Sequence, residues 1–481
     1  MEEQNSLKKN AVYNVLRTLM QVIFPLITFP YASRVLLPVG LGKVNFANSI
    51  IQYFALLGSL GISNYGIREA AKIRDQKKLF SQFIKEIFTI NSIATLFSYV
   101  LFLLALFLVP KFRDYRVLLC ICSATILFTT LGIEWIYSAL EDFKYITIRS
   151  FIFQCISLML LFIFVKTEDD YIKYAAISVF SNVGSNICNF LHSRKFLIRV
   201  HQRMNLKRHV KPIFILFSKS VAVSVYTMLD VTMLGFMSTD KEVGIYTAAT
   251  KMVRILTSLI IAATAVFMPR LSYYAEQNNY NKFQAILKKS INFLLFFSIP
   301  SVIGLIIISK PIILLLSGNS FAPSIKVMQI MSPLLLILSL SNFNGIQIFI
   351  PLRKDKYILY TTLVGAFVNF ILNYFLIPRY YSAGAGFASV IAELSVTFFG
   401  FLFVKKYFDF RSIIKPTLQY CLATISFILP LIFIVRIIQS PILQVFLCIL
   451  VAALIYVMVL FLLKNRFIIS CIKYIKNKFF R

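Results

Sequence analysis

ILQVFLCILVAALIYVMVLFLL, residues 442–463, is an uncharged apolar segment near the C-terminus of the 481-residue chain. About 20 apolar residues cross a bilayer as a helix, so this segment predicts a transmembrane helix. The composition extends that prediction to the whole chain, because 59% of the residues are hydrophobic and only 14% are charged. Soluble domains are about half apolar and a quarter charged. We therefore predict an all-α integral membrane protein and exclude the soluble, disordered and secreted disulfide-rich classes.

Apolar runs of similar length recur along the chain and predict about 14 transmembrane helices. They are expected near residues 13–33, 44–66, 87–109, 117–139, 146–165, 171–191, 213–235, 244–268, 290–308, 327–350, 357–378, 384–404, 417–435 and 442–463.

The net charge of +31 is distributed as a membrane topology requires. With a cytoplasmic N-terminus, the inside segments carry 34 of the 50 lysines and arginines and the outside ends carry 12. Cytoplasmic loops accumulate positive charge. We therefore predict that both termini are cytoplasmic, and this asymmetry explains most of the charge without a nucleic-acid partner. The four remaining basic residues lie inside predicted spans: Arg17, Lys219, Lys251 and Arg254.

A short motif occurs in both halves of the chain. GKVNFA at residues 42–47 opens the second predicted span, and GIYTAA at residues 244–249 opens the eighth. A parallel repeat of six spans predicts two six-helix lobes in a pseudo-twofold arrangement. We expect an N-lobe at 1–205, a C-lobe at 206–410, and two further helices with a basic cytoplasmic tail at 411–481.

Motifs of soluble catalysis do not occur in the sequence. It contains no GxxxxGK[ST] phosphate loop and no GxSxG, HExxH or CxxC motif. The seven cysteines lie mostly in apolar runs and the three histidines share one basic loop, so we expect no metal site and no cofactor. We predict a transporter without an ATPase module rather than an enzyme.

Charged side chains inside predicted spans are the first candidate functional residues. A charge near the bilayer centre costs about 2.5–3.5 kcal/mol unless it faces a cavity or a partner. Lys251 and Arg254 share one face of the eighth span, so we expect them to face a water-filled cavity. For Arg17 and Lys219, an alternative places the charged ends at the cytoplasmic surface. The acidic residues in spans are Glu134, Asp230 and Glu393.

Amide side chains form stripes in several predicted spans. One alternative is that they form hydrogen bonds between helices. Stripes in both halves, together with excess positive charge, favour a central lumen for a polar anionic solute. The stripes contain Asn45, Asn48 and Gln52 in the second span, Asn182, Asn186 and Asn189 in the sixth, Asn342, Asn344 and Gln347 in the tenth, and Asn369 and Asn373 in the eleventh.

The N-terminal segments FPLITFP (24–30), YASRVL (31–36), GKVNFAN (42–48) and GISNYGIREA (61–70) resemble the signature of bacterial polysaccharide flippases. These are the O-antigen and capsule repeat-unit translocases of the multidrug/oligosaccharidyl-lipid/polysaccharide exporter superfamily. One departure is LPV at 37–39, where relatives commonly have Gly-Pro-Glu. The resemblance implies a MATE-like fold, a cationic lumen and alternating access in the inner (plasma) membrane of a bacterium.

The resemblance also implies the substrate and its partners. Undecaprenyl-diphosphate-linked oligosaccharide would move from the cytoplasmic to the outer leaflet for surface polysaccharide biosynthesis, alongside a polysaccharide polymerase and chain-length proteins. The polyprenol tail would stay in the lipid bilayer. We assign Arg17, Arg34, Lys251 and Arg254 to the diphosphate, Asn45, Asn48, Gln52, Asn369 and Asn373 to the sugar, and Asp230 and Glu393 to H⁺ or Na⁺ coupling.

Three alternatives remain at this point. A lipid II flippase has a similar number of spans. A cation-coupled multidrug exporter of the same superfamily would have an acidic lumen, to which Asp230 and Glu393 would belong. A membrane polysaccharide polymerase typically needs a large outside loop, which the predicted topology does not contain.

Overall fold

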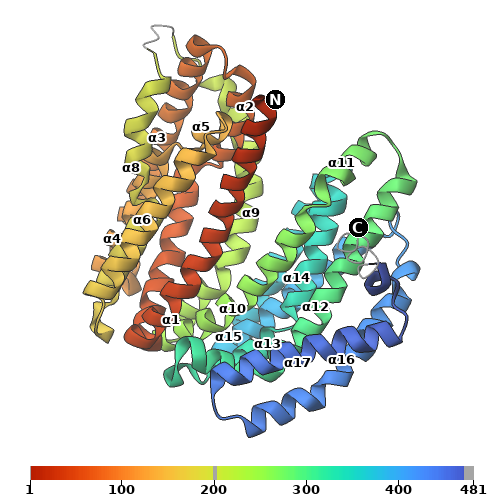
Figure 1. The fold of residues 1–481 in the computed structure, drawn as a ribbon. Coiled ribbons are helices and arrows are strands. Elements are labelled where there is room, and N and C mark those ends of the chain that lie inside the picture. The colour runs from red at the N-terminus through yellow and green to blue at the C-terminus, as the bar shows by residue number, and fades with distance from the viewer. Residues whose placement is uncertain (1, 199–202, 471–481) are drawn as a thin grey trace. The chain divides into compact units, whose positions relative to one another are not determined.

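The computed structural model describes residues 2–198 and 203–470. Their side chains are described except at residues 2–12, 14, 15, 18, 19, 21, 22, 219, 222 and 223, so the prediction for Lys219 lies outside the described side chains. Part of the predicted basic tail, residues 471–481, also lies outside them. The described residues form helices and turns without a strand (Figure 1). The prediction of an all-α protein is confirmed.

The chain divides into two compact units, Met1–Gly244 and Ile245–Arg481. The first unit contains α1 (Glu2–Ser59), α2 (Ile62–Ile73), α3 (Lys77–Leu108), α4 (Arg116–Gly132), α5 (Glu134–Ala139), α6 (Phe143–Phe164), α7 (Tyr171–Val179), the π-helix η3 (Phe180–Gly184), α8 (Asn186–Ser193) and α9 (Lys207–Met237). Short 3₁₀ turns are η1 (Pro110–Tyr115), η2 (Glu168–Asp170) and η4 (Arg194–Phe196).

The second unit begins within α10 (Asp240–Ala265). It continues with α11 (Met268–Glu276), α12 (Tyr280–Ser317), η5 (Asn319–Phe321), α13 (Ser324–Met331), α14 (Leu334–Asn342), the π-helix η6 (Phe343–Phe349), α15 (Asp355–Val404), α16 (Arg411–Ile437) and α17 (Pro441–Leu462). The lobe boundaries expected from the repeat, after residues 205 and 410, stay a prediction.

Nine helices of the described residues are long and apolar enough to cross a membrane, or ten if the bent pair Ser324–Met331 and Leu334–Phe349 forms one span. One of the nine, Asp355–Val404, is all of α15 and covers two predicted spans, and another, Ile23–Ile73, contains the end of the first predicted span and all of the second. The predicted sixth span is divided by η3. A multi-pass membrane protein is therefore confirmed, whereas the number fourteen and the orientation stay predictions.

The interruptions in α1 and α15 fall where outside loops are predicted. Leu37 in α1 has φ 58° and ψ 177°, and Tyr381 in α15 has φ 51° and ψ −130°. Leu37 precedes Pro38, whose ring disfavours helical backbone in the preceding residue. The local sequence therefore explains the break in α1.

Gly42 and Gly244, the first residues of the repeated motif, lie in close backbone contact within the first unit. A Cβ atom at Gly42 would collide with the carbonyl oxygen of Asp240, and one at Gly244 would collide with that of Pro38. Only glycine permits such an approach. Because Pro38 and Asp240 are separated by the same interval as the two glycines, the contacts are reciprocal, as a twofold relation between the two segments requires.

Each unit has its own apolar core. In the first, Tyr65, Phe83 and Trp135 pack where α2, α3 and α5 meet. In the second, the core joins α12, α16 and α17. Large apolar side chains also face outward, such as Leu108 on α3 and Leu429 on α16, which are 76% and 77% exposed. Outward apolar surface of this kind suits a lipid environment.

Candidate functional site

A polar cavity of about 520 Å³ lies within the first unit. Asn48 and Gln52 of α1 and Asn182 of η3 contribute amide groups to its lining. Hydroxyl groups come from four helices: Ser59 of α1, Thr125 and Thr129 of α4, Ser178 of α7 and Ser224 of α9. Amides and hydroxyls both donate and accept hydrogen bonds, so the cavity suits an uncharged polar ligand.

The amide stripe of the sixth predicted span is split between two roles. Asn182 lines the cavity, whereas Asn186 donates to the carbonyl oxygen of Phe128 at 3.0 Å and Asn189 donates to that of Gly132 at 2.8 Å. The α4 helix ends there because Ile133 has a left-handed backbone, and its last carbonyls lack intrahelical partners. Hydrogen bonding between helices therefore explains Asn186 and Asn189.

The five predicted sugar-binding amides do not share one environment. Asn48 and Gln52 line the cavity together. Asn45 donates to the Leu41 carbonyl oxygen of its own helix at 2.8 Å. Asn369 and Asn373 are buried on α15 in the second unit, where the Asn373 amide donates to Asn369 Oδ1 at 3.0 Å.

The predicted charged residues are likewise distributed over several helices. Arg34 is exposed on α1, and on α10 Lys251 is half-buried and Arg254 exposed. Asp230 is buried on α9, and Glu393 is half-buried on α15. Their roles in diphosphate binding and cation coupling stay predictions.

Arg17 forms an ion pair that the sequence did not predict. Its guanidinium contacts Glu134 Oε1, while Nη2 of Arg149 on α6 lies 3.7 Å from Glu134 Oε2. Arg149 is one of the 34 basic residues of the predicted inside segments, in the segment 140–149, yet only 6% of its side chain is exposed. Its position inside the predicted span 146–165 was the sequence signal for burial. We name Arg17, Glu134 and Arg149 the α1–α5–α6 charge cluster.

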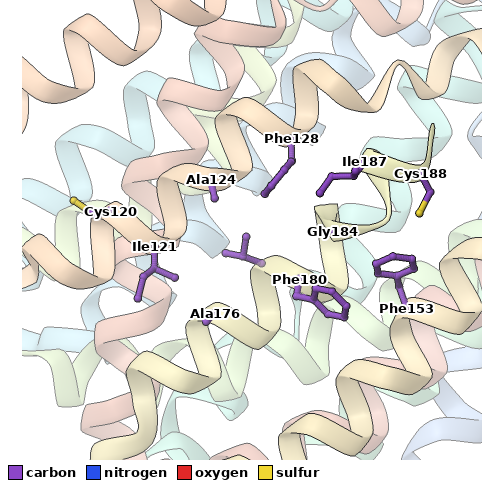
Figure 2. Close-up of a pocket in the computed structure, with 11 residues that line it drawn as sticks. Cys120, Ile121, Ala124, Phe128, Phe153, Ala176, Phe180, Gly184, Ile187 and Cys188 are labelled. Carbon is purple, nitrogen blue, oxygen red and sulfur yellow. The ribbon is translucent and has the colours of Figure 1, made fainter. Parts of the chain in front are cut away.

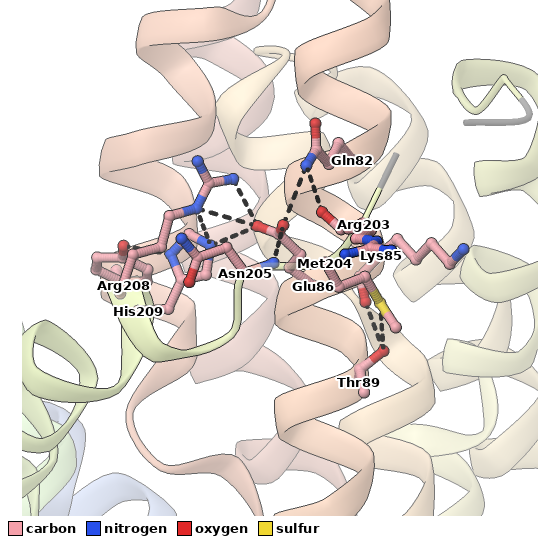
Figure 3. A network of polar contacts seen from close by, with 10 residues as sticks. Gln82, Lys85, Glu86, Thr89, Arg203, Met204, Asn205, Arg208 and His209 are labelled. Carbon is pink, nitrogen blue, oxygen red and sulfur yellow. Dashed lines mark hydrogen bonds and ion pairs between the residues drawn. The ribbon is translucent and has the colours of Figure 1, made fainter. Parts of the chain in front are cut away.

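A second cluster surrounds Glu86 of α3 (Figure 3). Its carboxylate accepts hydrogen bonds from the backbone N–H of Asn205 at 2.8 Å and from the Arg208 guanidinium at 2.6 Å. His209 Nε2 lies 2.7 Å away, and His209 Nδ1 lies 2.8 Å from the Tyr65 hydroxyl. The His209 ring therefore joins the Tyr65 hydroxyl to the Glu86 carboxylate. This Glu86 cluster fastens the start of α9 to α2 and α3.

An apolar pocket of about 540 Å³ lies beside the polar cavity (Figure 2). It is lined by α4, α6, α7, η3 and α8, and Phe128, Phe153 and Phe180 point toward it. Val179 lines both spaces, so α7 and η3 form the wall between them. The free thiols of Cys120 and Cys188 belong to the apolar side.

Comparisons with known proteins agree with this architecture. The family model described as "Polysaccharide biosynthesis protein" matches residues 7–275, more than half of the chain, and the model "MatE" matches residues 216–375. A candidate O-antigen transporter of Escherichia coli (strain K12) is 26% identical over 412 residues, which cover 83% of this chain and 97% of that protein.

Two solved structures share the fold. The lipid II flippase MurJ in an inward closed conformation matches with a TM-score of 0.75 at 18% identity, over 93% of this chain and 98% of that one. An inward-facing multidrug transporter of the MATE family matches with a TM-score of 0.62 at 14% identity, over 82% and 97%. The predicted MATE-like fold class is confirmed.

Proposed function

We propose, on the premise that the chain belongs to the polysaccharide biosynthesis protein family, that it is a flippase for lipid-linked oligosaccharides. The substrate would be an undecaprenyl-diphosphate-linked repeat unit, moved from the cytoplasmic to the outer leaflet by alternating access. The E. coli relative, named for O-antigen transport, supports a role in surface polysaccharide biosynthesis. We also propose that the protein lies in the bacterial inner membrane with both termini in the cytoplasm. Its proposed neighbours there are a polysaccharide polymerase and chain-length proteins.

The polar cavity is the observation that carries this proposal. Its described lining contains amides and hydroxyls from several helices and no charged side chain. Sugar hydroxyls require this kind of lining, because each both donates and accepts. A cation-exporting site would instead need carboxylates at the cavity, so the lining favours the oligosaccharide over a cationic drug.

The diphosphate explains how transport would proceed without an ATPase. A diphosphate diester carries about two negative charges, and an inside-negative membrane potential favours their outward movement by about 2.3 kcal/mol per charge per 100 mV. Two charges gain about 4.6 kcal/mol, a bias of about 2,000-fold. We assign the diphosphate contacts to Arg17, Arg34, Lys251 and Arg254. Asp230 and Glu393 are the proposed residues for any coupled cation.

Purified protein in proteoliposomes with its lipid substrate tests the proposal. With no pH or Na⁺ gradient, a potassium-diffusion potential should set the direction in which the oligosaccharide lipid is flipped. Flipping that ignores the potential would indicate electroneutral exchange through Asp230 or Glu393. A protein that moves lipid II but no oligosaccharide lipid would be a lipid II flippase, and one that moves neither would contradict the proposal.

Cavity variants test the site itself. Asn48→Ala and Gln52→Ala should each slow flipping about five-fold, because one hydrogen bond contributes about 1 kcal/mol. Asn292→Ala is the matched control, since the Asn292 amide donates to Lys288 in its own helix α12. Equal effects from all three variants would remove the cavity from the mechanism.

A further inference from the structure

The α1–α5–α6 charge cluster contains more positive than negative charge. Arg17 and Arg149 share the single carboxylate of Glu134. Arg17 contacts one oxygen directly, whereas Arg149 lies 3.7 Å from the other, which exceeds a hydrogen-bond distance. The cluster therefore has a net charge of +1. Arg149, the more buried of the two arginines, has the weaker interaction with the Glu134 carboxylate.

Arg149 has poor hydrogen bonding for a buried guanidinium. Its Nη1 and Nη2 atoms reach the Ser185 carbonyl oxygen and the Ser150 hydroxyl only at 3.4 Å. Its Nε atom is buried and forms no hydrogen bond within the described part of the chain. A buried charge normally has a full set of partners, because its desolvation is costly. The incompletely used donors of Arg149 lie beside the partly exposed carboxylate of Glu134. They suit a ligand that has more negative charge and more acceptor oxygens than this carboxylate.

We propose that this cluster is a binding site for a diphosphate group and that Glu134 occupies the place of the phosphate oxygens until the ligand arrives. A diphosphate has about two negative charges and several acceptors, which match the two guanidinium forks. Glu134 can leave because 35% of its side chain is exposed, whereas Arg149 at 6% stays in place. The inference deepens the proposed function, on which it rests, by adding Arg149 and Glu134 to the diphosphate site.

Ligand exchange would also change what fastens α1. Besides the Arg17–Glu134 pair, the Thr147 hydroxyl of α6 donates to the Tyr13 carbonyl oxygen at 3.1 Å. When a diphosphate displaces Glu134, Arg17 follows the ligand, whereas the Thr147–Tyr13 hydrogen bond still joins α1 to α6. Loading of substrate thereby loosens α1 from α5 at the predicted cytoplasmic end of the first unit.

The chain provides its own probe for this site. Trp135 is its only tryptophan and directly follows Glu134. It is buried in the core of the first unit, with 4% exposure. Its fluorescence should therefore respond when Glu134 changes partner, without any added label.

Titration of the full-length protein with inorganic pyrophosphate, followed by Trp135 emission and by thermal unfolding, tests the inference. Pyrophosphate should shift both signals in the wild type. Glu134→Gln should tighten its binding about tenfold, because it removes a competing negative charge that contacts Arg17 and lies 3.7 Å from Arg149. Arg149→Gln should weaken it at least about tenfold, because charge-assisted hydrogen bonds are lost. Arg149→Lys should recover part of the affinity.

The Arg74–Glu141 pair supplies matched controls. Arg74 Nη1 lies 2.9 Å from Glu141 Oε1, and both side chains are exposed. Glu141→Gln and Arg74→Gln make the same charge changes on the same unit and should leave pyrophosphate affinity within about twofold. Control effects as large as those at Glu134 and Arg149 would mean general attraction to a basic protein, and would overturn the site.

Two further measurements distinguish a lipid-linked diphosphate from a free one, and distinguish failure of this inference from failure of the proposed function. A polyprenyl diphosphate in vesicles should compete with pyrophosphate if the lipid-linked group uses this site; binding of pyrophosphate alone would assign it to a free diphosphate. No response of Trp135 or of thermal unfolding in either the wild type or Glu134→Gln would overturn the inference, even if flipping is intact. Pyrophosphate binding in a protein that flips no lipid would overturn the proposed function and leave the site standing.

Discussion

Glu86 and Glu134 are both carboxylates held by two basic side chains in the first unit, and they differ in everything else. Glu86 is fully buried, and its oxygens receive donors from Asn205, Arg208 and His209. Glu134 is 35% exposed, and one of its two arginines lies beyond hydrogen-bond distance. A carboxylate shared by two basic side chains can therefore stabilise the fold or hold a binding site for a ligand. Which of the two it does depends on how completely its partners are hydrogen-bonded.

The physical basis of the difference is desolvation. A carboxylate removed from water needs hydrogen bonds to every lone pair, and removing one partner of such a buried pair costs about 3–5 kcal/mol. A partly exposed carboxylate exchanges its partners with water at little cost. The Glu86 cluster should therefore determine stability, whereas the α1–α5–α6 charge cluster should determine ligand response.

The largest expected effect is that of Glu86→Gln. Glutamine keeps the shape but places an NH₂ group among the donors of Asn205, Arg208 and His209, so unfolding should become easier by about 3–5 kcal/mol. Thermal unfolding in detergent, followed by light scattering or size exclusion, measures the change. A variant as stable as the wild type would show that the start of α9 is held by other contacts.

An intermediate effect is expected for His209→Phe. The ring keeps its packing against Phe83, but the Tyr65 hydroxyl and Glu86 each lose one hydrogen bond. Leaving buried polar groups unsatisfied costs about 1–3 kcal/mol each. The double variant His209→Phe with Tyr65→Phe should recover part of this loss, because it removes the unsatisfied hydroxyl. An unchanged loss in the double variant would place the whole effect on Glu86.

Glu134→Gln should cost much less stability than Glu86→Gln. The Arg17–Glu134 pair is partly exposed, and such a pair contributes about 0.2–1 kcal/mol, while Arg149, although buried, forms no direct hydrogen bond that the substitution would remove. The loss of unfolding free energy should therefore be several-fold smaller for Glu134→Gln than for Glu86→Gln when the two variants are measured side by side. Equal losses would show that both clusters are structural, and the comparison on which their separate roles depend would fail.

The sequence predicted the helical membrane fold and much less of the site. Long uncharged runs such as 442–463 determine a transmembrane helix by themselves, because one physical quantity, apolar length, decides the outcome. The repeated glycines at 42 and 244 likewise predicted a symmetric relation before their contact was known. Asn48, Gln52 and Asn182 belong to the predicted polar stripes and line the cavity, but the sequence could not predict which members of each stripe do so.

The reason is that these roles depend on local backbone and tertiary partners. The π-helix at Phe180–Gly184 and the left-handed Ile133 together direct Asn186 and Asn189 to the end of α4. No periodicity in the sequence predicts either the π-helix or the left-handed residue. The sequence singled out Glu134 only as an acidic residue in a span, and Arg149 entered only the charge count of the predicted inside segments. Their pairing with Arg17 requires three helices to be placed in space.

A third carboxylate, Asp170, is expected to have the smallest effect of the three, because all its partners are close to it in the sequence. It accepts hydrogen bonds from the backbone N–H groups of Lys166 and Thr167 at 2.8 and 2.9 Å, and Lys173 Nζ lies 2.6 Å away. These donors hold the pKa of the Asp170 carboxyl well below its usual range.

A depressed folded-state pKa means that the stabilisation is present above the unfolded pKa, about 3.9, and is lost as the pH falls below it. Asp170→Asn should therefore lower the melting temperature slightly and by a constant amount from pH 7 to pH 5. The difference from the wild type should then shrink between pH 4 and pH 3, where the wild type begins to lose the same interaction. Parallel melting curves of the two proteins at pH 7, 5, 4 and 3 measure this. A gap that stays constant to pH 3 would show that the loop depends on the shape of Asp170 and not on its charge, and charge would then matter only where carboxylates are shared between helices, as at Glu86 and Glu134.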